Sequence, residues 1–312
     1  MRLRSIGSAL ALAYIGRLAS AQESYDHWTI EAMAAQARIV FRGTITDLSR
    51  IEFDPKPGQP LKVRNMLTLG VAERFKGSPD RWMTLDRETV ASDGRYELWL
   101  KNKTALLWFT FSEEDPRPFP GSVIGPGLKL PAGQSWTAIH LSPPDPAEFA
   151  ADPRASKGTF SMDFSVLNTD AEKLEATRKF LKNNPGATKV CRISIPVSLT
   201  NSIGYTGPSE HLVLPVSPEL EGIALRMINS PDTFLPNVHT AAEATWIRAD
   251  GVKLLGNFNS EKNVTLVKSL LNDPGKGPSD SMESATKTYF WVRLASYNVL
   301  SDWGIKVSKP VL

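Results

Sequence analysis

The chain has 312 residues, with 36 Lys and Arg against 33 Asp and Glu, 4 His and 1 Cys. Its net charge of +3 equals the contribution of Arg2, Arg4 and Arg17, so the chain beyond residue 21 is formally neutral. Nucleic-acid binders carry a basic patch or stripe, and no Lys/Arg cluster occurs here, so nucleic acid is not expected as a partner. A single Cys excludes an intramolecular disulfide.

Residues 1–21 have the three-part pattern of a secretory signal peptide. A basic start precedes an apolar stretch from Ile6 to Ile15, and Ala19-Ser20-Ala21 has the small-residue form of a cleavage site. The stretch is shorter than the ~20 apolar residues that span a bilayer. We therefore expect a secreted or periplasmic protein with no membrane span.

Residues 22–147 are predicted to form an antiparallel OB-like β-barrel, preceded by a helix at 29–37. Apolar and polar residues alternate in RIVFRGTITDL and KVRNMLTLGV, as in half-buried strands. TALLWFTF, residues 104–111, is apolar on both faces and is predicted to be a central strand. Weaker strands are predicted in RWMTLDRE and SWTAIHLS, and Gly/Pro-rich turns separate the segments.

Residues 148–216 are predicted to be a linker and a short α/β bridge. A Pro/Ala-rich stretch is followed by a strand and by a helix that Thr169 and Glu172 begin as a capping box. KVCRISIPVS is a predicted strand with Cys191 and Ile193 on one face, and HLVLPVS is another. We expect this bridge to dock between the two ends of the chain.

Residues 217–312 are predicted to be helical, because the apolar period changes to 3.6. Ser217 and Pro218 suit the first positions of a helix, and Gly304 suits the end of the last one. Four stripes follow: Leu220, Ile223, Ala224, Met227 and Ile228; Ala242, Trp246, Ala249, Val252 and Leu255; Val264, Val267, Leu270 and Leu271; Val292, Ala295 and Val299. Two hairpins are fewer than a free-standing solenoid needs, so we expect them either to lean on the rest of the chain or to form one compact HEAT-like bundle. The fold predicted overall is α+β.

Several phrases resemble known modules. RIVFRGTITDLSR and LTLGVAERFKGSPDRWMTL resemble the opening of a secreted OB-fold-like barrel of the tissue-inhibitor-of-metalloproteinase type. SPELEGIALRMINSPD and GVKLLGNFNSEKNVTLVKSLLNDPG resemble short HEAT-like helical pairs. Together they resemble an uncharacterised family of secreted proteins from planctomycete-type bacteria, over nearly the whole mature chain. This resemblance implies architecture and location, and no established activity.

One property of those inhibitors does not carry over. They chelate the catalytic zinc of a protease through an N-terminal cysteine, whereas the expected mature chain starts Gln22-Glu23-Ser24. Inhibition by that chemistry is therefore not predicted.

No cofactor or metal site is predicted from the reactive residues. Cys191 has apolar neighbours on its face and is interpreted as a packed, inert thiol. The histidines, His27, His140, His211 and His239, show no metal-ligand spacing. No Walker loop, Rossmann fingerprint or calcium loop is present.

The residues for acid–base or nucleophilic catalysis are equally scattered. Ser209 and His211 would share a strand face, but no nucleophile turn of the GxSxG type accompanies them. The acidic residues Glu113-Glu114-Asp115 and the pair Asp145 and Glu148 stand beside Pro in predicted loops, where carboxylates are usually solvated. We therefore name no catalytic residue.

The aromatic residues are the remaining candidates. Some gather in the predicted barrel (Trp99, Trp108, Phe109, Phe111) and others in the predicted helices (Trp246, Phe258, Phe290, Trp291, Trp303). Core packing is the favoured interpretation, and a surface that holds sugar or peptide is the alternative. We thus expect a non-enzymatic extracytoplasmic protein that binds a protein or a glycan through barrel loops or an inter-domain groove. A hydrolase whose site assembles only in three dimensions, or a protease inhibitor without zinc chelation, is the alternative.

Overall fold

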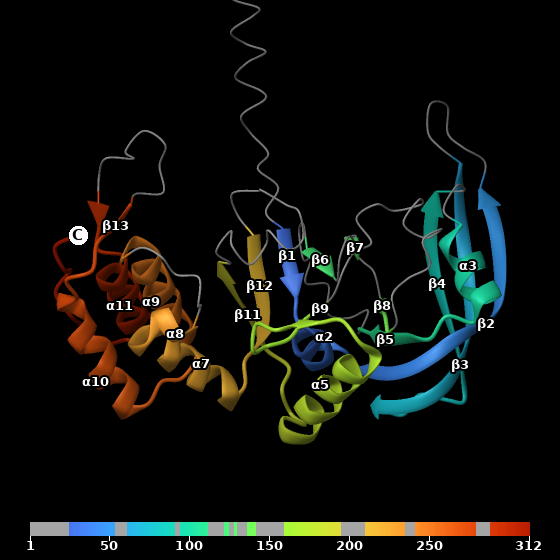
Figure 1. Ribbon diagram of the computed structural model, residues 1–312, viewed down its shortest axis with the longest axis horizontal. Helices are drawn as coiled ribbons and strands as arrows, with labels where there is room; N and C mark the ends of the chain where they lie inside the picture. The colour runs from blue at the N-terminus through green and yellow to red at the C-terminus, as the bar shows by residue number, and fades with distance from the viewer. Residues whose placement is uncertain are drawn as a thin grey trace, which may run out of the picture.

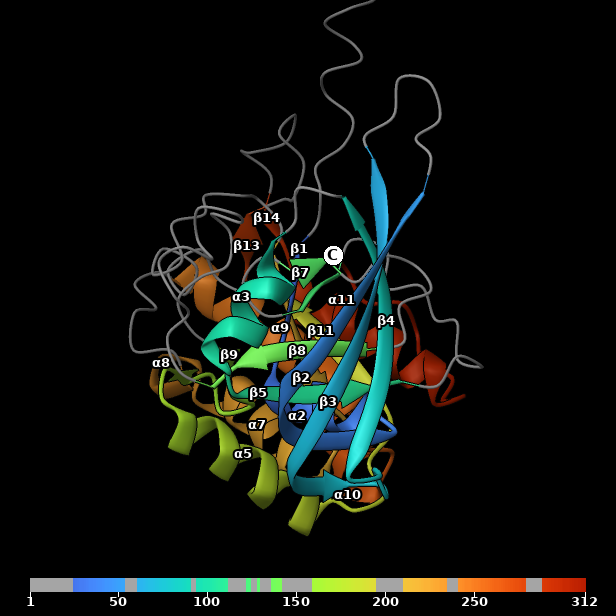
Figure 2. The same ribbon diagram turned by 90° about the vertical axis from the view of Figure 1, so that its right-hand side faces the viewer.

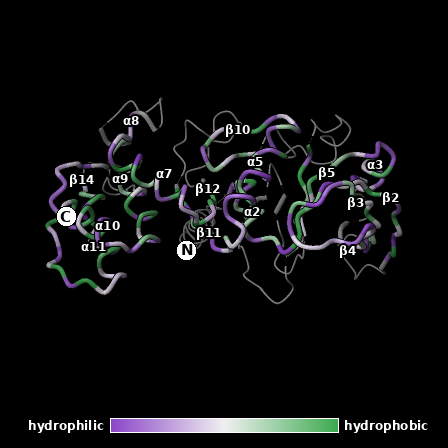
Figure 3. Tube along the Cα trace, turned by 90° about the horizontal axis from the view of Figure 1, so that it is seen from below, coloured by the Kyte–Doolittle hydropathy of each residue, from purple (hydrophilic) through white to green (hydrophobic). Residues whose placement is uncertain are grey.

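The computed structural model describes residues 25–53, 61–90, 94–111, 122–124, 128–129, 136–141, 159–194, 210–234, 241–278 and 288–312. The molecule is elongated, with an antiparallel sheet at one end, a mixed sheet in the middle and helices at the other end (Figure 1). The α+β class predicted from the sequence is confirmed. Figure 3 shows hydrophobic stretches both along β5 in the terminal sheet and in the helical part, where separate apolar cores form.

The terminal sheet is antiparallel throughout and open. Its strands in spatial order are β4 (Trp82–Val90), β3 (Lys62–Lys76), β2 (Ile39–Phe53), β5 (Leu106–Thr110) and β8 (Trp136–His140). β4 and β8 lie at opposite edges, so the described strands do not close into the predicted barrel. β2 pairs with β5 only over residues 39–43 and continues with β3 to Phe53, so the two halves of the sheet are of unequal length.

β5 is the buried central strand that its sequence predicts, since all of its residues are buried. One face, which includes Trp108, packs against α3 (Arg95–Asn102), a helix that the sequence did not indicate. The opposite face, with Leu107 and Phe109, packs against α2 (Ile30–Gln36). The Trp108 indole N–H donates to the carbonyl oxygen of Gly43 at 3.1 Å, which fixes the ring inside the core.

The middle sheet is mixed. Its strands in spatial order are β11 (Val190–Ser194), β12 (Glu210–Pro215), β1 (Tyr25–Trp28), β6 (Ser122–Ile124) and β7 (Leu128–Lys129). β1 runs parallel to both β12 and β6, and the outer pairs are antiparallel. This sheet thus combines strands from the predicted barrel segment with strands from the predicted bridge.

Two helices lie in the region between the two sheets (Figure 1). α2 is almost entirely buried and begins at Thr29, whose hydroxyl accepts from the Ala32 N–H. α5 (Asp170–Asn183) packs against α2 and begins with the predicted capping box of Thr169 and Glu172. The Lys76 ammonium of β3 donates to the carbonyl oxygens of Ala34 and Ala35, which the end of α2 leaves unpaired. A small hairpin, β9 (Thr159–Phe160) and β10 (Val166–Leu167), precedes α5.

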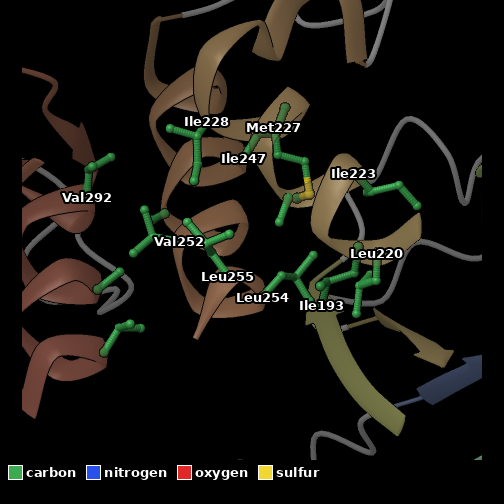
Figure 4. Packing of buried hydrophobic residues seen from close by; sticks show 14 of the residues in the cluster. Ile193, Leu220, Ile223, Met227, Ile228, Ile247, Val252, Leu254, Leu255 and Val292 are labelled. Atoms are coloured by element: carbon green, nitrogen blue, oxygen red, sulfur yellow. The ribbon is translucent and has the colours of Figure 1, made fainter. Parts of the chain in front are cut away.

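The helices of the C-terminal part pack around one apolar core (Figure 4). Its elements are α7 (Pro218–Asn229), α8 (Pro231–Phe234), α9 (Ala241–Leu255), α10 (Glu261–Ser269), the 3-10 helix η2 (Leu270–Asn272), the hairpin β13 (Gly277–Pro278) and β14 (Thr288–Tyr289), and α11 (Trp291–Asp302). α9 packs between α7 and α11. The predicted α7 stripe is buried throughout.

The predicted stripe of α9 is wrong at one residue. Trp246 is 42% exposed, whereas Ile247 and Leu254 are buried. Because α9 is covered by α7 on one side and by α11 on another, its apolar surface is wider than one stripe and lies on other residues than predicted. Within the described residues, no helix combines the length and hydropathy needed to cross a bilayer.

Candidate functional site

The Cys191 thiol and the imidazoles of His27 and His140 are packing groups. Cys191 is half-buried on β11 against the helical core, and burial raises the pKa of its thiol to about 12, so the thiol stays protonated and inert. His27 lies edge-on to Phe160 with ring centroids 5.7 Å apart, and burial lowers its pKa to about 4. His140 lies edge-on to Trp99 at 5.4 Å.

No metal site forms among the described residues, where no group of three or more His, Cys, Asp or Glu comes together. His239, the acidic run 113–115, Asp145 and Glu148 lie outside the described residues.

The Ser209 and His211 pair is only partly described, because Ser209 lies outside. His211 on β12 has different neighbours in register: Ser194 of β11 on one side and Asp26 of β1 on the other. Residues directly opposite each other on paired strands occupy the same face of a sheet. The register therefore sets Ser194, His211 and Asp26 at matching positions on three neighbouring strands, and Ser209 is not one of these neighbours.

Glu31 is a buried carboxyl that no pattern in the sequence singles out. It lies in the first turn of α2, where the Ser161 hydroxyl donates to Oε1 at 2.7 Å and the Met162 N–H donates to Oε2 at 2.9 Å. Burial raises its pKa to about 7, against the opposing effect of these hydrogen bonds. The group ties α2 to the β9–β10 hairpin.

The aromatic residues divide into core and surface. Trp99, Trp108 and Phe109 are buried, as the core interpretation predicts, and Phe258 and Trp303 pack partly buried against the helical core. Trp246 differs, since it is exposed on α9.

Trp246 belongs to a group of aromatic rings beside the β13–β14 hairpin. Tyr289 of β14 is 37% exposed, and its ring lies 5.5 Å from that of Trp291 at an interplanar angle of 31°. Trp291, at the first position of α11, is half-buried. We call Trp246, Tyr289 and Trp291 the aromatic face.

Gly277 of β13 lies where the two indoles converge. A Cβ at this position would stand 2.9 Å from Trp291 Cδ1, 3.3 Å from Trp291 Nε1 and 3.4 Å from Trp246 Nε1. The absence of a side chain at residue 277 is thus what allows both indole N–H groups to approach the same backbone segment.

A partly buried ion pair holds this segment in place. The Arg248 guanidinium donates to Asp273 Oδ1 at 3.1 Å and Oδ2 at 2.5 Å, and its Nε donates to the Ile228 carbonyl oxygen at 3.0 Å. Arg293 Nε donates to the Asp273 carbonyl oxygen at 2.6 Å. A bidentate pair of this kind is geometrically specific, so it fixes residues 273–277 against α9 and α11.

Two cations stand over Phe290, next to the aromatic face. The Arg293 guanidinium lies 3.6 Å from the ring centroid, and the Lys276 ammonium lies 5.0 Å from it. These contacts order the junction between β14 and α11 on which Tyr289 and Trp291 stand.

The comparisons with known proteins add no assignment: no protein-family profile matches the sequence, and no curated protein matches it significantly.

Proposed function

We propose that the chain is an exported, non-enzymatic binding protein that holds a glycan on the aromatic face. The observation that carries the proposal is the convergence of the Trp246 and Trp291 indoles over Gly277, with Tyr289 exposed beside them. A large aromatic ring left partly in water costs free energy that its burial elsewhere would recover. Exposed rings on a well-fixed segment therefore indicate a ligand.

The chemistry of the aromatic face suits a sugar. A sugar ring presents apolar C–H groups on its faces and hydroxyls at its edge, and an indole offers both an apolar ring face and an N–H donor. A stable protein interface needs about 800 Å² on each partner, which two or three partly exposed rings do not supply by themselves. A glycan of a few sugar residues needs a much smaller contact area.

The proposal includes location and architecture. The basic and apolar leader of residues 1–21 supports export, and the formal neutrality of the remainder suits a neutral saccharide. We further propose that the packed pairs of α7, α9 and α11 are HEAT-like and that the open sheet of β2–β5 and β8 derives from an OB-like head.

A glycan array followed by calorimetry tests the proposal. The purified protein is expected to bind at least one oligosaccharide, and Trp246→Ala is expected to weaken that binding about tenfold or more, since one stacked ring contributes about 1–3 kcal/mol. Trp82→Ala is the matched control, because Trp82 is 53% exposed and begins β4, a strand at the end of the molecule opposite to the helices (Figure 1). Failure to bind any saccharide, or equal losses in both variants, would refute the aromatic face as the site.

Gly277→Ala tests the same site without removing a ring. The added methyl would displace the Trp291 indole, so we expect binding to fall while the melting temperature changes by only a few degrees. Unchanged affinity in this variant would show that the convergence of the indoles has no role.

A further inference from the structure

The outer edge of the terminal sheet is long and open. β4 has 9 residues and is the end strand, and among the described residues no strand pairs with its outer side. An open edge presents a row of backbone N–H and C=O groups that another extended chain can pair with. Natural proteins commonly cover or shorten such edges, so an edge of this length needs an explanation.

The backbone groups that face outward can be identified from one hydrogen bond. Val71 N–H donates to the Arg81 carbonyl oxygen at 3.0 Å, and Gly70 lies opposite Trp82. Hydrogen-bonded and non-hydrogen-bonded pairs alternate along an antiparallel ladder. Residues 83, 85, 87 and 89 therefore bond to β3, and residues 82, 84, 86 and 88 direct their N–H and C=O groups toward the open edge.

We propose that two copies of this chain associate by antiparallel pairing of their β4 strands, which joins the two terminal sheets into one continuous sheet. The inference concerns self-association and does not depend on the glycan site.

The sequence of β4 specifies one register. A twofold axis perpendicular to the sheet places one residue opposite its own copy. With Leu85 on the axis, Thr84 stands opposite Asp86 of the second copy, and Trp82 opposite Glu88 of the second copy. Both pairs consist of residues whose backbone groups face the open edge, as the ladder requires.

The neighbouring registers oppose like charges. An axis at Asp86 places that residue opposite itself, and an axis at Arg87 places Asp86 opposite Glu88. An axis at Thr84 places Arg81 opposite Arg87. Like charges directly opposite each other destabilise a strand pair. Only the Leu85 register pairs most of the strand without opposing like charges. This self-complementarity is why we assign a second copy of the chain as the occupant of the edge.

Within the part of the chain that the structure describes, no helix or strand pairs with the outer side of β4. α3 contacts β2 and lies on the side of the sheet away from β4 (Figure 2). Trp82 and Thr84 are exposed, and Met83 and Leu85 are only half-buried at the margin of the aromatic core under α3. Pairing through the Leu85 axis would bury both Leu85 side chains against each other and so extend that core across the dimer.

Analytical ultracentrifugation tests the proposal with a pair of variants at residue 84. Native protein is expected to be dimeric at micromolar to tens of micromolar concentration. Thr84→Pro removes an outward N–H without touching the ladder to β3 and is expected to be monomeric, whereas Thr84→Val keeps the N–H and the dimer. A native protein that is monomeric at high concentration, or a dimer that persists in Thr84→Pro, overturns the proposal.

Charge variants at residue 84 provide a second test, because they keep the backbone N–H and do not depend on whether Thr84→Pro folds. Thr84→Asp places a carboxylate opposite Asp86 of the second copy and should shift the equilibrium toward monomer, whereas Thr84→Lys should shift it toward dimer. Equal shifts contradict the register.

Leu85→Cys should cross-link on oxidation and Thr84→Cys should not, because Cα atoms of a non-hydrogen-bonded pair lie about 4.5 Å apart, within disulfide range. Cross-linking only in Thr84→Cys would likewise refute it.

Discussion

Gly251→Ala is expected to destabilise the protein by about 2 kcal/mol, although alanine is the better helix former. Gly251 is buried within α9 where this helix crosses α7. A Cβ there would stand 2.8 Å from Met227 Cβ, 2.9 Å from the Ala224 carbonyl oxygen and 3.0 Å from Ile228 Cγ1. The Ala224 oxygen is a backbone atom and the Met227 Cβ is bonded directly to the backbone, so a side-chain rotation cannot move either away. The two helices must therefore separate.

Gly222→Ala is the matched control. Gly222 lies in the interior of α7, and a Cβ there would meet no atom within 4 Å. The same substitution should therefore stabilise the protein by about 0.5–1 kcal/mol, through helix propensity alone.

Denaturant unfolding measures both changes as differences in midpoint at constant slope. If both variants gain stability, the close approach of α7 and α9 does not exist in solution, and the packing in Figure 4 is wrong there.

The second large effect concerns pH and the pair Glu31 and His27. The pKa of Glu31 is raised to about 7 and that of His27 is lowered to about 4, each mainly by burial. Between their ordinary values of 4.5 and 6.5, folded Glu31 holds a proton that the unfolded chain has lost, while folded His27 lacks one that the unfolded chain holds. The two groups therefore affect the pH dependence of stability with opposite signs.

The signs follow from each group separately. The contribution of Glu31 is fully present below pH 4.5 and is lost as the pH rises to about 7. The contribution of His27 is present above pH 6.5 and is lost as the pH falls to about 4. Each amounts to at most about 3 kcal/mol, and over the shared window the two nearly cancel.

Single substitutions should separate the contributions of the two groups to the pH dependence of the free energy of unfolding. Glu31→Gln is expected to lower the free energy of unfolding more at pH 4.5 than at pH 6.5. The difference between the two losses should be up to about 2–3 kcal/mol. His27→Phe should show the opposite change in slope, and the double variant should return to about the native slope. The free energy of unfolding at a series of pH values measures this, and slopes equal to the native one in both single variants would mean that neither group is perturbed.

Local features were predictable from the sequence because they depend on few neighbours. The capping box of Thr169 and Glu172, the buried face of α7 and the two-sided burial of β5 all follow from patterns within one segment. Trp246 was assigned to the core because period alone cannot tell which side of a helix another segment covers.

Other features depend on chain segments that are distant in sequence. The closed barrel was expected because the alternation of apolar and polar residues does not reveal whether the edge strands β4 and β8 pair with each other. Glu31 looked like an ordinary acidic residue in a first helical turn, and its burial depends on Ser161 and Met162 of the β9–β10 hairpin. Gly277 carries no signal in the sequence, since its role comes from two indoles supplied by different helices.

The parallel position of β1 has a consequence for how the protein is made. Tyr25 pairs in register with Glu210, so this strand emerges from the ribosome long before the partner that flanks it on one side. The middle sheet must therefore assemble late, after most of the polypeptide is available, and such long-range closure makes folding slow. A nascent or translocating chain would spend that interval with an uncovered strand, which is the period when a chaperone would be of most use.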